Sequence, residues 1–378
     1  MLIKLFHIIS LVMPICCIIM SCNTQEKDSV TIKDIKLSKL DGEKSITDLF
    51  EDFQLIPLEN KRECMLSNVQ KLTVTDDKYY IYNEGGDPAV LCFRFDGEFS
   101  HRIGSLGRSK SEYPYINDMA LNEKEHVISL LLDNEVKVYD ALSGEYLYSK
   151  EIDSSTRIQK IEWLPLQGYI GCSNHIGADY QIYMFDSLYN VIEKILPSTQ
   201  EVTSVLSYET NPIQVDGKRC CFFDFHTSTF HFIDSEHPHS VLSHVLLSAN
   251  ILTMAGAASD SYYQSTYDCV ISECFAEKKV IGLMNYDKRI CYFIYDIEKE
   301  TFRIYQCLDW PVGILDYHNG YYYAVITPDD LIDIIKEDSY MPTNTQDVIR
   351  EALAACHDYQ LLDKNNYLIL KMKLKKGL

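Results

Sequence analysis

Short apolar runs and polar turns alternate along most of the chain, and one unit of this pattern recurs six times. Each unit starts with a polar turn, continues with a strand-like run, and reaches a second run that usually ends in an aromatic residue and Asp, as in Val136–Asp140. Their spacing of about 42 to 61 residues is typical of β-propeller blades, which hold four strands each. The turns lie at Asp77-Lys78, Glu123-Lys124, Gln167-Gly168, Asp216-Gly217, Glu277-Lys278 and Asn319-Gly320.

The sixth unit differs from the others. Its first run is followed by a helical pattern over Asp329–Asp338 and Asp347–His357, and the second run comes only at Tyr367–Lys373, with no outer strand after it. A closed ring leaves no unpaired strand edge. We therefore expect the strand-like segment Phe53–Leu58, near the N-terminus, to complete the last blade.

The pattern as a whole predicts an all-β fold. The predicted fold is a six-bladed β-propeller of four-stranded antiparallel blades over residues 45–378, closed by an N-terminal strand and with a short helical insert in the last blade. The 27 Tyr and 15 Phe residues agree with this prediction, because aromatic side chains favour pleated, half-buried surfaces. A β-sandwich with irregular loops is the alternative, and the regular four-strand period favours the propeller.

The N-terminus has the pattern of an export signal. Leu5–Ser21 is almost wholly apolar, Lys4 precedes it, and polar residues begin directly after Cys22. The sequence Ile19-Met20-Ser21-Cys22 resembles a bacterial lipobox, which predicts a lipoprotein signal peptide over 1–21, lipidation at Cys22 and a polar stalk over 22–44. Plain secretion and a spanning helix are the alternatives, although about 20 apolar residues are needed to cross a bilayer. We expect the cell envelope as location, with membrane contact through the N-terminal lipid only.

Charge and cysteine content narrow the function further. The formal net charge is −20, and phosphate backbones are bound mainly by Lys and Arg, so no nucleic-acid partner is expected. The ten cysteines beyond Cys22 include no CxxC pair, which leaves a zinc ribbon or a thioredoxin-like motif without support. We expect buried thiols, with Cys269 and Cys274 as one pair close enough in sequence to form a disulfide.

The motifs of common enzymes are missing from the sequence. It contains no GxSxG, HExxH, Walker-type or dinucleotide-binding glycine loop. Propeller enzymes can hold a metal in the central channel, where Asp118 and Asp316 are the acidic candidates beside the predicted innermost strands. Five histidines between His226 and His244 could ligate a metal, but we interpret them as exposed turn residues. No metal and no cofactor are expected.

One connection toward the hub carries side chains suited to a polar or carbohydrate ligand. Arg108, Glu112 and Tyr113 would offer it a guanidinium, a carboxylate and an aromatic face. Trp163 and Trp310, the two tryptophans, occupy equivalent positions before their turns, where packing at the hub is the favoured role. The candidate ligand-binding residues are Arg108, Glu112, Tyr113, Asp118, Trp163 and Trp310.

Several segments resemble a known family. Phe95–Gly104 leading into Gly107–Tyr113 resembles the F-D-x-G-x-F strand and G-x-G-P-G-E-Y/F loop of six-bladed β-propeller lipoproteins common in Bacteroidetes, whose architecture is related to NHL-type propellers. Ile56–Glu59 and Asn366–Leu374 are similar to the family's P-L-E segment and closing strand. The resemblance implies fold and envelope location but little about activity. The family's Gly-Pro-Gly suits a tight turn with positive φ, and Ser109-Lys110-Ser111 replaces it here. The resemblance therefore does not extend to a ligand role of this loop.

Together these observations predict a lipid-anchored propeller of the bacterial cell envelope that binds on one face without catalysis. We expect a monomer, and its partner would be an envelope protein or a glycan-type ligand. One alternative is a metal-dependent hydrolase or lyase with its site in the central channel. The other is a purely structural interaction scaffold.

Overall fold

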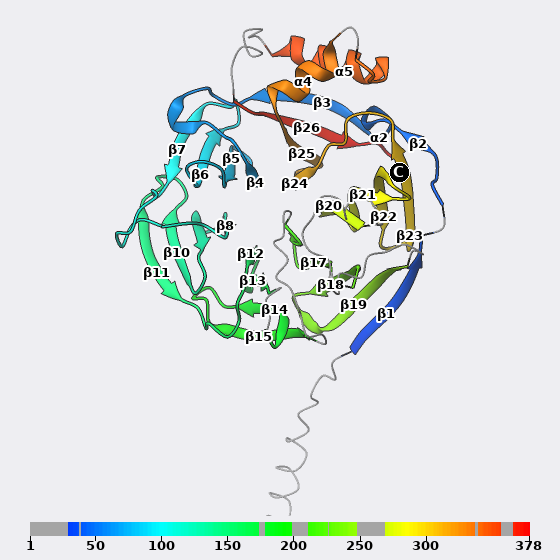
Figure 1. Ribbon diagram of the computed structural model, residues 1–378. Coiled ribbons are helices and arrows are strands. Elements are labelled where there is room, and N and C mark those ends of the chain that lie inside the picture. The colour runs from blue at the N-terminus through cyan, green and yellow to red at the C-terminus, as the bar shows by residue number, and fades with distance from the viewer. Residues whose placement is uncertain are drawn as a thin grey trace, which may run out of the picture.

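The computed structural model describes residues 29–37, 39–173, 178–198, 211–225, 227–247, 269–336, 339–356 and 366–378. Six sheets are arranged around a central axis, each with its first strand at the hub (Figure 1). The predicted six-bladed propeller is therefore confirmed. The predicted signal peptide and the lipidation site Cys22 lie outside the described residues.

The first three blades hold four antiparallel strands each. In each blade the strands follow one another from hub to rim in chain order, because short turns join neighbouring strands. Blade 1 consists of β4 (Val69–Val74), β5 (Lys78–Asn83), β6 (Ala89–Arg94) and β7 (Phe99–Ile103). Blade 2 consists of β8 (Asp118–Asn122), β9 (Val127–Leu131), β10 (Glu135–Asp140) and β11 (Tyr146–Glu151). Blade 3 consists of β12 (Lys160–Leu164), β13 (Gly168–Cys172), β14 (Tyr180–Phe185) and β15 (Val191–Pro197).

Blades 4 and 5 each gain a fifth, parallel strand at the rim. The strand β1 joins blade 4 and the short strand β2 joins blade 5 (Figure 1). Blade 4 consists of β16 (Ile213–Asp216), β17 (Arg219–Asp224), β18 (Thr229–Asp234), β19 (His237–Leu247) and β1 (Ser29–Lys36). Blade 5 consists of β20 (Cys269–Ala276), β21 (Lys279–Tyr286), β22 (Arg289–Asp296), β23 (Thr301–Cys307) and β2 (Glu43–Lys44).

The strand β1 corrects part of the predicted polar stalk over residues 22–44. Eight residues of that segment pair with β19, from Ser29 opposite Ser240 to Lys36 opposite Leu247. The outermost strand of a blade leaves a row of backbone N–H and C=O groups unpaired, and a neighbouring segment can satisfy them whatever its side chains are. The polar composition of residues 29–36 therefore did not prevent strand formation.

Blade 6 closes the ring in the way the sequence predicts. It consists of β24 (Ile314–His318), β25 (Tyr321–Ile326), β26 (Leu368–Leu374) and the N-terminal strand β3 (Phe50–Pro57). The pairing of β26 with β3 is antiparallel. Both ends of the propeller thus lie in one sheet, which leaves neither of them as a free edge inside the ring.

The helical insert of blade 6 is also confirmed. The helix α4 (Pro328–Ile335) begins with a capping box formed by Thr327 and Asp330, and Pro328 occupies its first position. The helix α5 (Thr343–Ala355) packs against β3 at the rim (Figure 1). The remaining short elements are α2 (Ile46–Leu49) and the 3₁₀ helix Arg62–Cys64. Among the described residues, no helix is long and apolar enough to cross a bilayer.

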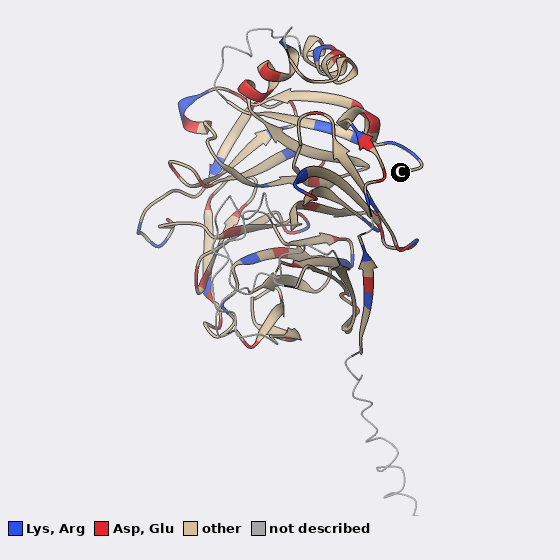
Figure 2. Cartoon of the chain, turned by 45° about the vertical axis from the view of Figure 1, so that its right-hand side comes forward, with Lys and Arg blue, Asp and Glu red and all other residues tan. Residues whose placement is uncertain are grey.

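The core lies between the blades. Alternate side chains of one strand enter two different interfaces: Tyr169 of β13 packs with residues of blade 2, and Ile170 packs with residues of blade 4. No disulfide links the ten described cysteines, and seven of them are buried. The predicted buried thiols are therefore present, and Cys269 and Cys274 do not form a bridge. Acidic residues are spread over the blades and the helices (Figure 2), in agreement with the net charge of −20.

Candidate functional site

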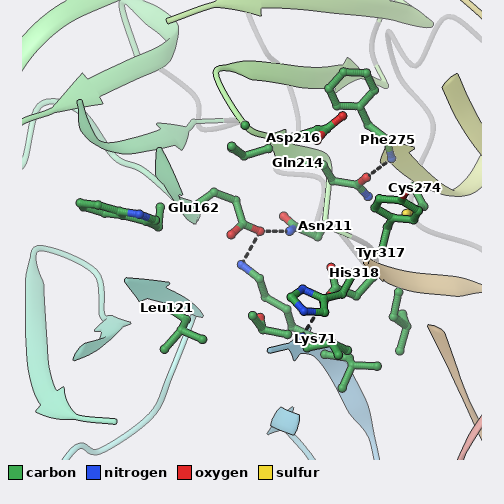
Figure 3. Close-up of a pocket in the computed structure, with 18 of the residues that line it drawn as sticks. Lys71, Leu121, Glu162, Asn211, Gln214, Asp216, Cys274, Phe275, Tyr317 and His318 are labelled. Atoms are coloured by element: carbon green, nitrogen blue, oxygen red, sulfur yellow. Dashed lines mark hydrogen bonds and ion pairs between the residues drawn. The ribbon is translucent and has the colours of Figure 1, made fainter. Parts of the chain in front are cut away.

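The first strands of all six blades surround a cavity of about 640 Å³ at the hub of the propeller (Figure 3). The turns that connect the first and second strands of the blades form its rim, with Glu123 and Glu277 among the rim residues. The walls carry polar and aromatic side chains from every blade. They include Lys71, Glu162, Trp163, Gln214, Cys274 and Asp316.

Polar side chains link the first strands of neighbouring blades across the hub. Asp118 Oδ2 accepts a hydrogen bond from Ile161 N at 2.7 Å, and Asp316 Oδ2 accepts one from Val74 N at 2.6 Å. Gln214 makes the same kind of bond, because its side-chain oxygen accepts from a backbone N–H of β20. These N–H groups belong to strands that are not paired across the blade boundary, so a side chain must satisfy them.

Lys71 joins blades 1, 2 and 3. Its Nζ lies 2.7 Å from Glu162 Oε1 and 3.3 Å from Asp118 Oδ2. It also donates to the carbonyl oxygens of Met119 at 2.6 Å and Ile161 at 3.1 Å. Burial alone would lower the pKa of Lys71, but the carboxylates of Asp118 and Glu162 outweigh this effect and raise it. The amine is therefore held charged at neutral pH.

The carboxyl groups near Lys71 are also affected by their surroundings. Burial raises the pKa of Glu162, Asp118 adds to this by charge repulsion, and Lys71 acts in the opposite direction. Glu162 Oε1 accepts a second hydrogen bond from Asn211 Nδ2, at 2.5 Å. Burial raises the pKa of Asp316 to about 7, although its bond from Val74 N favours the charged form. The hub thus places several carboxyl groups around one lysine whose amine is already bound.

A further acid lies beside the cavity, within the interface of blades 4 and 5. Glu273 of β20 is 4% exposed, and neither of its carboxyl oxygens has a hydrogen-bond partner among the described residues. Burial raises its pKa to about 8. The group is therefore protonated at neutral pH, in contrast to the ion pair formed around Lys71.

The structure separates the predicted ligand-binding residues. Trp163 lines the hub cavity and packs edge-on against Tyr169, with ring centroids 5.0 Å apart. Asp118 is 1% exposed and is used to bind Lys71 and the next blade. Trp310 packs against the core between blades 5 and 6. Of these three residues, Trp163 alone lines the cavity.

The remaining predicted residues lie at the other end of the strands. Arg108 and Glu112 line a second cavity, of about 850 Å³, between the connection that leads to β8 and the turn after β9. Glu112 accepts a hydrogen bond from Ser109 N at 2.8 Å and so holds its own loop. Tyr113 is fully buried, and its hydroxyl donates to Ile103 O. It has no surface left for a ligand, so the structure corrects its predicted place in a ligand site.

Two of the histidines differ from the prediction of exposed turns. His231 and His244 are buried on β18 and β19, where His231 Nδ1 lies 2.8 Å from Ser243 Oγ and His244 contacts the Tyr295 hydroxyl. Burial lowers the pKa of His231 to about 4. His226 lies outside the described residues. Across the part of the chain that the structure describes, no three His, Cys, Asp or Glu side chains are grouped so as to hold a metal.

The sequence prediction missed the residues that give the cavity its chemistry. Lys71, Glu162 and Asn211 were not among the candidates, although Lys71 and Glu162 lie on the first strands of their blades. A charged residue in the middle of an innermost strand is the signal that could have identified Lys71 and Glu162, because charges are rarely buried without a partner.

Comparisons with known proteins identify a family and support the fold. The family described as "Domain of unknown function (DUF4934)" matches residues 30–353. A crystal structure of a Bacteroides fragilis NCTC 9343 protein described as exported is similar over 92% of this chain and 100% of that chain, with a TM-score of 0.68 and 15% identity. BamB from Moraxella catarrhalis matches with a TM-score of 0.42 and 9% identity, over 72% of this chain and 75% of its own. No curated protein matches the chain.

Proposed function

The chain belongs to the DUF4934 family, and we propose that it is an exported binding protein whose hub cavity holds a small polar ligand without catalysis. The observation that carries the proposal is the cavity of about 640 Å³ to which the first strands of all six blades contribute. Ligand pockets have volumes of roughly 300 to 1,000 Å³ and carry a few convergent polar groups on mostly preformed walls. The hub cavity fits this size, with walls supplied mainly by strands and a rim formed by turns.

The two potential nucleophiles of the cavity favour binding over nucleophilic catalysis. Cys274 is a potential nucleophile in the wall, but burial raises its pKa well above the usual value, so the thiol stays protonated. Lys71 would need a neutral amine to act as a nucleophile, and the carboxylates of Asp118 and Glu162 keep it charged. Both groups are suited to hold the hub together and to shape a ligand site.

The proposal includes a lipid anchor at Cys22 that keeps the protein in the cell envelope. Its support is the sequence Ile19-Met20-Ser21-Cys22, together with the similarity to a Bacteroides fragilis protein described as exported and the resemblance to Bacteroidetes propeller lipoproteins of NHL-like architecture. We expect the Cys22→Ser variant to move from the membrane fraction to the soluble envelope fraction and to lose incorporation of labelled fatty acid. A Cys22→Ser protein that stays in the membrane fraction would contradict the anchor.

The binding proposal predicts that at least one class of small polar compound stabilises the protein through the hub cavity. The test is a thermal-shift screen of the chain from residue 23 onward against amines, sugars, amino acids, carboxylates and nucleosides. The Glu277→Arg variant reverses a charge at the exposed cavity rim, and it should abolish the shift that a true cavity ligand produces.

The matched control for the rim variant is Glu145→Arg. Glu145 is an exposed acid in a turn of blade 2, away from the cavity, so this substitution changes the net charge by the same amount. The ligand shift should survive in Glu145→Arg. If no class of compound stabilises the protein, or if both variants lose the shift equally, the hub cavity is not the binding site.

A further inference from the structure

Several hydrogen-bond donors of the hub cavity are already bound within the protein. Lys71 Nζ is occupied by two carboxylates and two carbonyl oxygens. Asn211 Nδ2 donates to Glu162, and the side-chain nitrogen of Gln214 donates to Glu273 O. The Tyr317 hydroxyl donates to Glu277. These side chains already donate within the protein, so they offer a ligand fewer donors than their number suggests.

Acceptor atoms of the same walls stay available. Glu162 uses Oε1 for both Lys71 and Asn211, and no described residue donates to its Oε2. Glu277 binds the Tyr317 hydroxyl through Oε1, and its Oε2 likewise accepts nothing from the described residues. Asn211 Oδ1 is buried without a hydrogen-bond partner in the described part of the chain. A ligand would therefore meet oxygen atoms that can accept hydrogen bonds.

The charge of the cavity lining also favours a cationic ligand over an anionic one. Five acidic residues line the cavity, and Lys71 is the one lysine or arginine that the described residues contribute to it. Because the carboxylates of Asp118 and Glu162 already surround that lysine, an anionic ligand would find repulsion and no free cation. The aromatic rings of Trp163 and Tyr317 also line the cavity, and aromatic faces attract cations. The acidic residues are Glu123, Glu162, Asp216, Glu277 and Asp316.

We propose that the ligand of the hub cavity is a small organic amine, which presents an ammonium or guanidinium group to Glu162 and to the acidic rim. This inference rests on the proposed binding function and names its ligand class. An ammonium group carries three hydrogen-bond donors, no acceptor and a positive charge, which complements the acceptor atoms and the acidic residues of the site. A neutral sugar would not gain the charge attraction that the acidic lining offers.

The test compares amines with a neutral and an anionic compound by isothermal titration calorimetry at low ionic strength. Putrescine and spermidine carry the amines, 1,4-butanediol is the neutral match of putrescine, and succinate is an anionic match. We expect both amines to bind with a stoichiometry near one, and neither butanediol nor succinate to bind. Binding should weaken on raising the salt concentration, because charge attraction is screened.

Variants locate the amine within the cavity. Removing one charge-assisted contact should weaken spermidine binding about tenfold in Glu162→Gln and in Glu277→Gln. The matched control Glu145→Gln removes an exposed charge elsewhere and should change the affinity less than about twofold. Circular dichroism melts report whether each variant is folded. Since Glu277 is exposed at the rim, its variant keeps the test valid if Glu162→Gln does not fold.

The outcomes separate the amine from the binding function. If a neutral sugar binds and Glu277→Arg abolishes its binding, the cavity is a ligand site but the amine proposal is wrong. If spermidine binds at several sites and equally well to Glu277→Gln and Glu145→Gln, it binds the acidic surface, and the proposal is wrong. If no compound of any class binds, both the amine proposal and the proposed function fail.

Discussion

The Lys71→Met variant is expected to lose about 3 to 5 kcal/mol of the free energy of unfolding. Methionine keeps the length of the side chain but removes the charge that faces Asp118 and Glu162. Lys71 and Asp118 have side chains that are 6% and 1% exposed, so water cannot replace the missing charge. Urea denaturation of the chain from residue 23 onward, followed by circular dichroism and tryptophan fluorescence, measures the loss.

A matched variant shows whether burial is the cause. Lys61 forms an ion pair of 2.7 Å with Glu59, but its side chain is 55% exposed, so Lys61→Met should change stability little. Adding Glu162→Gln to Lys71→Met should restore part of the lost stability, because it removes one of the two uncompensated carboxylates. Equal stability losses in Lys71→Met and Lys61→Met would show that burial of the ion pair is not the cause of the loss.

Deleting residues 1–57 is expected to abolish cooperative folding, whereas deleting residues 1–44 should leave a folded ring. The longer deletion removes β3, the outer strand of blade 6, and exposes the edge of β26. The shorter deletion removes β1 and β2, which only add parallel strands to the rims of blades 4 and 5. Thermal melts by circular dichroism and size-exclusion chromatography distinguish a folded monomer from an aggregated chain.

The two deletions test which N-terminal strand is essential. We expect a sharp melting transition for the shorter deletion, at a somewhat lower temperature than for the chain from residue 23 onward. The longer deletion should give no sharp transition and should elute as aggregate. A sharp transition in both proteins would show that the ring does not need β3.

The number of blades and the helical insert could be predicted from local patterns. The closure by an N-terminal strand, expected at Phe53–Leu58, followed from the missing outer strand of the last unit. Alternation of apolar and polar residues, turn residues at regular spacing and helix caps are local properties, and each is visible within a few residues. The strand Ser29–Lys36 could not be predicted in this way. Its partner β19 lies about 200 positions later, and the pairing uses backbone groups that every residue has.

The candidate site was predictable only in part. Trp163 could be placed near the hub because its position relative to the following turn was known, and it lines the cavity. Arg108 and Glu112 were expected to face the same hub region, but they lie in a different cavity at the other end of the strands. A strand pattern shows which face a side chain occupies, but it does not show at which end of the strands a ligand cavity forms.

The sequence by itself determined the repeated blade, because the forces that form hairpins act between residues close in the chain. It also indicated where the ring closes, because the last unit lacks an outer strand. Only the tertiary structure decided the chemistry of the hub. Asp316 and Val74 meet across 242 positions, and Lys71 reaches the carbonyl of Ile161 across 90. These contacts exist because a closed ring brings the first strands of all blades to one axis, and no local pattern records which side chains will then face each other.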